Sequence, residues 1–106
     1  MEIKFSDWQN LDLKVGTVLE VKQHPNADKL YVLKVDIGKE INLVAGIKEH
    51  YSEQDLVGKQ IVVFTNLEKK PLRGVISEGM LLAVDDDNEV ALLIPDKKVK
   101  NGAKIR

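Results

Sequence analysis

The chain has 106 residues, no cysteine and a formal net charge of −1, with 16 basic against 17 acidic residues. This length predicts one domain, residues 1–106, and the lack of cysteine excludes disulfides and thiolate metal sites. The balanced charge argues against a general nucleic-acid binder, which usually has a strong basic excess. Because no apolar run could cross a bilayer and the first residues lack the order of a signal peptide, we expect a cytoplasmic domain without membrane association.

The charges are unevenly placed along the chain. Five cations and one acid occupy residues 96–106, three cations occupy residues 69–73, and acids concentrate at residues 85–89. Segregation of this kind permits a basic face on a protein that is neutral overall. A mosaic of solvated charges explains the same pattern, so the charge distribution alone leaves both interpretations open.

The N-terminal part predicts a short helix and a long strand. Ser6 and Gln9 have the spacing of a capping box, which favours a short opening helix. Apolar and polar residues then alternate over Leu13–Lys22, which predicts a strand, and Gly16 inside it indicates a bulge or bend. The residues expected on one face of this strand are Leu13, Val15, Thr17, Leu19 and Val21.

The segment "HPNADK", His24–Lys29, follows this strand. Pro25 cannot donate to a strand ladder, so it ends the strand. Asn26 and Asp28 are residue types that hydrogen-bond their own turn backbone. We therefore expect a turn in which His24 is partly exposed.

The rest of the chain predicts short strands around one small helix. Ser52 is the expected N-cap of that helix and Gly58 its C-terminal stop. The β-branched strand 60–67 is expected to be buried on both faces at its centre, and residues 68–77 to form a long polar loop. The other expected strands are 31–37, 41–45, 79–84 and 90–94.

The order of these elements predicts an all-β fold. Five main strands, a short helix between the third and fourth, and small N- and C-terminal extensions are typical of a five-stranded OB-fold barrel. A β-sandwich is the rival architecture, and it predicts more and shorter strands at even spacing. The observed pattern favours the barrel.

Catalytic and metal chemistry finds little support in the residues. His24 and Asp28 have no third ligand nearby and His50 stands alone, whereas a zinc site needs three or four ligands. Ser77, in "SEGM", lacks the leading glycine of a nucleophile elbow, and no phosphate-cradling glycine loop is present. We therefore expect a protein that is not an enzyme and that has no metal and no cofactor.

The segment "NLEKKPLRGVISEGM", residues 66–80, carries a more informative pattern. Lys69, Lys70 and Arg73, together with an Asn and a Ser, supply charges and donors for phosphate and ribose. A solvated loop, with Met80 as core filler, accounts for the same residues. The chain has one Trp, two Tyr and two Phe, too few for a platform that stacks many bases, which favours recognition of a folded RNA by shape.

Three segments together resemble a known family. "DLKVGTVLEVKQHPNADKLYVLKVDIG", "LVGKQIVVFTNLEKKPLRGVISEGMLLA" and the closing "IPDKKVKNGAKI" are similar to the tRNA-binding domain of the methionyl-tRNA synthetase C-terminus. The pair "HPNADKL" and S-x-G-M is the most specific part of the resemblance. It implies an OB fold that binds the outer corner of tRNA by structure and not by sequence. The RNA-contacting residues that it implies are Asn66, Lys69, Lys70, Arg73, Ser77 and Met80, with Lys29 as an addition at the barrel rim.

The resemblance also implies a function and partners. It implies a non-catalytic tRNA-binding protein that acts as a tRNA chaperone or as an auxiliary of methionyl-tRNA synthetase, because the chain is too short for a synthetase catalytic domain. The alternative is a protein-interaction module, either a secretion-chaperone-like protein or a synthetase dimerisation domain. The chain ends are more apolar than one small barrel needs, which predicts a homodimer interface. The residues concerned are Trp8, Leu11, Ile94, Val99 and Ile105.

Overall fold

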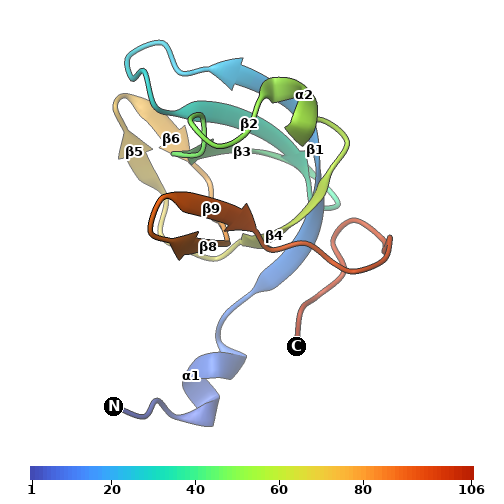
Figure 1. The fold of residues 1–106 in the computed structure, drawn as a ribbon. Coiled ribbons are helices and arrows are strands. Elements are labelled where there is room, and N and C mark those ends of the chain that lie inside the picture. Colours follow the sequence, from blue (N-terminus) through green and yellow to red (C-terminus); the bar gives the residue numbers. More distant parts are fainter.

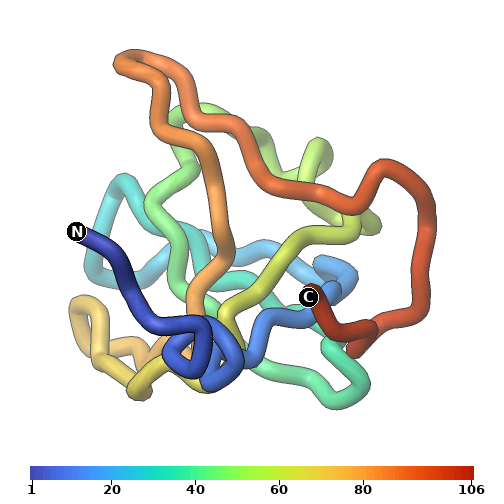
Figure 2. The backbone as a smooth tube through the Cα atoms, turned by 90° about the horizontal axis from the view of Figure 1, so that it is seen from below, coloured from blue at the N-terminus to red at the C-terminus, as the bar shows by residue number.

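The computed structural model describes residues 1–106, and it confirms the all-β, five-stranded OB-type barrel. An antiparallel sheet with strand order β3-β2-β1-β4-β7 curls into a nearly closed barrel (Figures 1 and 2). Two short helices and two further hairpins, β5–β6 and β8–β9, lie around it. The elements are α1 Phe5–Gln9, β1 Leu13–Gln23, β2 Tyr31–Asp36, β3 Glu40–Ala45, α2 Glu53–Leu56, β4 Gln60–Phe64, β5 Lys70–Leu72, β6 Val75–Ser77, β7 Met80–Leu81, β8 Ala83–Asp86 and β9 Glu89–Leu92.

Strand β1 is the central strand of the barrel, and a bulge divides it. Its first half pairs with β4 and its second half with β2, and the register with β2 shifts between Val18 and Glu20. The extra residue, Leu19, points outward and is 41% exposed, while Val18 is buried. The predicted continuous face was therefore wrong at Val21, which packs against the core cluster as Val18 does, because a bulge inserts one residue and reverses the alternation.

Gly16 has a different role from the predicted bulge. A Cβ atom at this position would lie 2.7 Å from Cγ1 of Val35 and 2.8 Å from Cγ2 of Ile37. Gly16 is therefore needed for the close approach of β1 to two core side chains, Val35 in β2 and Ile37 just after it.

The two helices differ in how well their ends were predicted. The N-cap of α1 is Lys4, without a side-chain cap, so the capping box at Ser6 was wrong: Ser6 already lies inside the first turn. In α2 the hydroxyl of Ser52 accepts the backbone N–H of Asp55 at 3.2 Å, which confirms Ser52 as N-cap. Gly58 has a φ of +89°, which confirms it as the residue that stops this helix.

The core fills the inside of the barrel. Its largest fully buried side chains include Leu33, Leu43, Ile61 and Leu56, the last from α2. Strand β4 buries alternate residues, and the residues between them are only half-covered, so the predicted burial on both faces was wrong.

The C-terminal third departs most from the expected elements. The expected strand 79–84 is split into β7 and the first strand of the β8–β9 hairpin, whose turn contains Asp87 at a φ of 53°. Within the predicted loop 68–77, residues 70–77 form the β5–β6 hairpin. The last residues return along β1: Gly102 donates to the carbonyl of Val15 at 2.7 Å and Ile105 to that of Leu13 at 2.8 Å. This brings the C-terminal end to the side of the barrel where α1 lies (Figure 1).

Candidate nucleic-acid interface

The β5–β6 hairpin projects from one side of the barrel, opposite the segment 94–104 (Figures 1 and 2). Its two-residue turn is Arg73–Gly74, with φ values of 55° and 93°. Positive φ at both central residues is the signature of a type I′ turn, which favours Asn, Asp or Gly. Arg73 carries the cost of a left-handed backbone at the tip of the hairpin, so turn geometry does not explain why an arginine stands there.

The cations of this hairpin form no ion pair with an acidic side chain. Lys69, Lys70 and Arg73 are exposed and form no ion pair, whereas Lys34 on the barrel wall pairs with both Glu20 and Glu40. An exposed cation without a partner keeps its full field for an incoming anion. The segment therefore gathers three free positive charges on a chain whose net charge is −1.

A cavity of about 360 Å³ opens at the base of the hairpin. Leu67, Leu72 and Met80 supply its apolar wall, and one acid and one cation, Glu68 and Lys70, line the same cavity. Met80 is half-buried in β7, so it forms part of a concave surface beside the free cations. An apolar wall next to positive charge is suited to a nucleobase or ribose that is attached to a phosphate.

Ser77 has a structural position at the end of β6. It is buried, and its hydroxyl accepts the backbone N–H of Val44 at 3.0 Å and donates to the carbonyl of Gly79 at 2.7 Å. Both of the usual roles of the hydroxyl are therefore used inside the barrel.

Asn66 lies at the exit of β4 and is likewise engaged with the backbone. Its Oδ1 accepts the N–H of Asp12 at 2.9 Å and its Nδ2 donates to the carbonyl of Asn10 at 2.8 Å. The side chain ties β4 to the link between α1 and β1, and one amide hydrogen remains for a ligand.

Lys29 differs from the hairpin cations because it forms an ion pair. Its ammonium lies 3.6 Å from Glu49, and both side chains are well exposed. Such a pair contributes little to stability, but it partly neutralises the charge of this lysine.

The turn 24–29 contacts the hairpin directly. His24 is buried, 6% exposed, with Nε2 2.9 Å from the carbonyl oxygen of Leu72 and Nδ1 accepting the N–H of Asn26 at 3.0 Å. Asn26 donates from Nδ2 to the carbonyl of Arg73 at 3.3 Å. The expected partial exposure of His24 was wrong because its ring fills the space between turn and hairpin. The expected self-capping by Asn26 was also wrong, because its amide reaches the hairpin; Asp28 makes no side-chain hydrogen bond.

The structure therefore brings most of the expected residues to one hairpin and its base. Lys69, Lys70, Arg73 and Met80 present atoms to solvent there, while Ser77 lies beneath them. The contacts of His24 and Asn26 with this segment do not follow from the sequence pattern. No local pattern identifies these contacts, since the partners lie 48 and 47 residues away in the sequence.

The carboxylate of Asp12, near the site, has a lowered pKa. A hydrogen bond from the Thr65 hydroxyl, at 2.8 Å, lowers the pKa of Asp12 below its ordinary value of 3.8, and the charges of Lys14 and Lys104 act in the same direction. Asp12 therefore stays ionised and holds the end of β4 next to Asn66.

Neither metal chemistry nor a membrane span is visible in the arrangement of side chains. No three His, Asp or Glu side chains gather where they could hold a metal ion. Neither helix is long and apolar enough to cross a membrane. The fold and the cationic hairpin define an OB-type binding domain.

The chain belongs to the tRNA-binding domain family. Residues 13–104 match the family model described as "Putative tRNA binding domain". The chain is 59% identical over 105 residues to the methionine–tRNA ligase of Pyrococcus horikoshii and 42% identical over 106 residues to that of Bacteroides fragilis. Each alignment covers 98% of this chain but only 14% and 16% of the relative, so the chain spans about one seventh of these ligases.

Solved structures with the same fold cover all or most of the chain. The chaperone CsaA from Bacillus anthracis is 33% identical, with a TM-score of 0.89 and full coverage of both chains. A MetRS-related protein from Pyrococcus horikoshii is 31% identical, with a TM-score of 0.90 and full coverage of both chains. The C-terminal domain of Plasmodium vivax p43 is 38% identical, with a TM-score of 0.86, over 91% of this chain and 59% of the other.

Proposed function

We propose that residues 1–106 form one non-catalytic domain that binds tRNA by shape and charge through the β5–β6 hairpin. The observation that carries the proposal is the group of three cations without acidic partners, Lys69, Lys70 and Arg73, on a chain of net charge −1. Phosphate contacts from such residues position an RNA without reading its sequence. The 59% identity to a region of a methionine–tRNA ligase supports tRNA as the RNA concerned.

Within this site the proposed residues divide into two groups. Lys69, Lys70 and Arg73 contact phosphates, and Met80 contacts a base or ribose in the cavity at the hairpin base. Asn66 and Ser77 support the site from the protein side, since their polar atoms already form hydrogen bonds with the protein backbone. Lys29 is a more distant contact. It pairs with Glu49, so a phosphate of the RNA must compete with this carboxylate for the lysine.

The biological role that we propose is that of a cytoplasmic auxiliary of methionyl-tRNA synthetase or of a general tRNA chaperone. The synthetase role is supported by the ligases, which carry this region as one part of a longer chain. In either role the domain raises the local concentration of tRNA and performs no chemistry itself, with neither metal nor cofactor.

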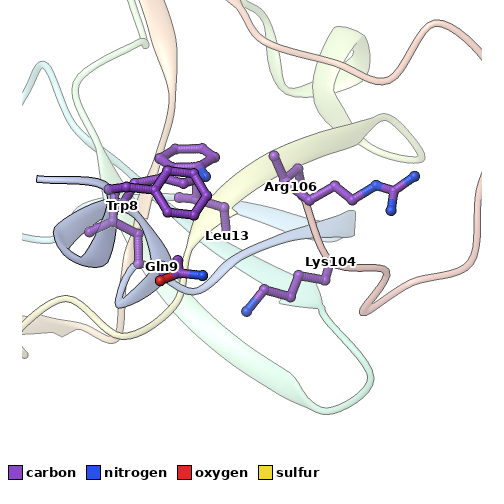
Figure 3. A pocket seen from close by; sticks show the side chains of 8 residues that line it. Trp8, Gln9, Leu13, Lys104 and Arg106 are labelled. Carbon is purple, nitrogen blue, oxygen red and sulfur yellow. The ribbon is translucent and has the colours of Figure 1, made fainter.

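A homodimer is the proposed assembly. Phe5 is 71% exposed and Trp8 36% exposed on α1, and a cavity of about 300 Å³ separates this helix from Ile105 and Arg106 (Figure 3). Exposed aromatic side chains beside an apolar hollow fit a second copy of the same surface, because two-fold interfaces are self-complementary.

The second candidate function is binding of unfolded protein clients, as in a secretion-chaperone-like module. The observation that favours it is the full-length similarity to the chaperone CsaA at a TM-score of 0.89. A direct comparison separates the two: fluorescence anisotropy with labelled total tRNA against a labelled unfolded peptide, at the same salt. Preferential binding of tRNA supports the first function, and preferential binding of the peptide supports the second.

A further inference from the structure

The β5–β6 hairpin has little backbone support of its own. Its two strands form a separate two-stranded sheet that does not join the ladder of the barrel. An isolated hairpin of this size is marginally stable in water. The position of Arg73 at its tip therefore depends on contacts from outside the hairpin.

His24 supplies one such contact, and the hydrogen bonds identify its tautomer. Nδ1 accepts the backbone N–H of Asn26 at 3.0 Å, so this nitrogen carries no hydrogen. The hydrogen of the neutral ring is therefore on Nε2, which donates to the carbonyl of Leu72 at 2.9 Å. The buried ring thus joins the turn 24–29 to the last residue of β5, and one tautomer satisfies both ends.

Asn26 supplies a second contact, to the next residue along the hairpin. Its Nδ2 donates to the carbonyl of Arg73 at 3.3 Å. The two hydrogen bonds hold consecutive carbonyls, that of Leu72 at the end of β5 and that of Arg73 in the left-handed tip. Because both carbonyls are held, the backbone of the turn is restrained, and with it the direction in which the Arg73 side chain points.

We infer that His24 and Asn26 are positioning residues of the RNA site: they set the hairpin so that Arg73 meets the phosphate. The inference rests on the proposed function. His24 itself is buried and has both ring nitrogens engaged, so it acts through the hairpin and does not touch the RNA.

Two substitutions at His24 separate the two ring nitrogens. His24→Asn keeps a short acceptor for the N–H of Asn26, as an Asx turn does, but cannot reach Leu72. His24→Gln carries an amide donor at about the depth of Nε2 and restores the bond to Leu72. If the hairpin bond matters for RNA, His24→Asn weakens tRNA binding roughly 2- to 10-fold, the range that one hydrogen bond accounts for, and His24→Gln recovers most of the loss.

A double-mutant cycle with Arg73→Ala shows whether His24 acts through Arg73. The measurement is tRNA affinity by anisotropy, at a temperature at which each variant is folded by circular dichroism. We expect His24→Asn to cost clearly less affinity in the Arg73→Ala background than in the wild type, because the group that it positions is gone. Equal costs in the two backgrounds overturn the inference, as does an affinity of His24→Asn equal to that of the wild type.

Asn26→Ala gives an independent check, since it removes the donor toward Arg73 without a change of charge. We expect weaker tRNA binding than for Asn88→Ala, the same exchange at an exposed Asn in the β8–β9 turn whose side chain makes no hydrogen bond. An Asn26→Ala protein that binds as tightly as the wild type contradicts the positioning role. If Arg73→Ala binds tRNA as tightly as the wild type, the proposed RNA site is wrong. If Arg73→Ala weakens binding but His24→Asn does not, only the positioning role is wrong.

Discussion

The hydroxyl oxygen of Ser77 accepts the backbone N–H of Val44 at 3.0 Å, across 33 residues of sequence. Together with the bond from the N–H of Glu78 to the carbonyl of Asn42 at 2.9 Å, it joins the end of β6 to β3. These contacts bring the two edges of the five-stranded sheet together, so the barrel is nearly closed although β3 and β7 form no ladder.

Ser77→Ala is expected to lower the stability of the protein. The substitution leaves the buried N–H of Val44 without its partner, which costs about 1–3 kcal/mol. Urea unfolding followed by circular dichroism measures the effect, with Ser6→Ala, at an exposed serine, as the control. A Ser77→Ala protein as stable as the wild type but weaker in tRNA binding would instead favour a direct contact with RNA.

Arg73→Ala is expected to weaken binding of every tRNA by a similar factor, on the order of 1 kcal/mol or more, because phosphate contacts do not read sequence. Both residues carry a Cβ, so the strain of the left-handed turn is unchanged and the melting temperature stays the same. The charge-matched control is Lys98→Ala, in the C-terminal segment on the opposite side of the barrel (Figure 1). An equal loss for both variants would show that net charge, and not the hairpin, drives binding.

The salt dependence of tRNA binding is expected to be steep. Each phosphate contact releases roughly 0.7 to 0.9 counterions, so the logarithm of affinity should fall linearly with the logarithm of salt with a slope of a few units. Removal of Lys70 should reduce this slope by about one. EDTA should have no effect beyond the loss of the magnesium-dependent fold of the tRNA. A flat salt response would favour the protein-client alternative.

The protein is expected to have the mass of a dimer by light scattering at micromolar concentration. Phe5→Asp places a charge on the exposed apolar face of α1 and should produce a monomer with the barrel intact, because Phe5 is outside the core. Val57→Asp, at a residue that is 52% exposed after α2, is the control and should remain dimeric. A monomeric wild type contradicts the proposed interface.

Asp12 is expected to contribute to stability only above acid pH. Its folded-state pKa is lowered, chiefly by the hydrogen bond from Thr65, so its contribution is present above the ordinary value of 3.8 and is lost as the pH falls through the folded pKa. Asp12→Asn should therefore be less stable than the wild type at pH 7, by up to about 1 kcal/mol because the group is partly exposed. The two stability curves should converge below about pH 4; a constant difference at all pH values would rule out this linkage.

Much of the candidate site was visible in the sequence as residue types but not as an arrangement. The cluster Lys69–Arg73 could be predicted because its residues are contiguous in the sequence, whereas its contact with the turn 24–29 could not. The hairpin was missed because its strands are three residues long, and Pro71 and the charges mask their β pattern. The roles of Ser77 and Asn66 could not be predicted, since their polar groups bond backbone atoms from distant segments.

The sequence by itself determined the features that depend on neighbouring residues: the alternating strands, the Ser52 cap, the Gly58 stop and hence the class of barrel. Only the tertiary structure decided which way Leu19 points, that His24 is buried, and that the turn 24–29 supports the tip at Arg73. The physical reason is that local patterns record backbone preference and amphipathicity within a few residues. A bulge, a buried hydrogen bond or a barrel closure depends instead on partners tens of residues away, and these meet only when the chain is folded.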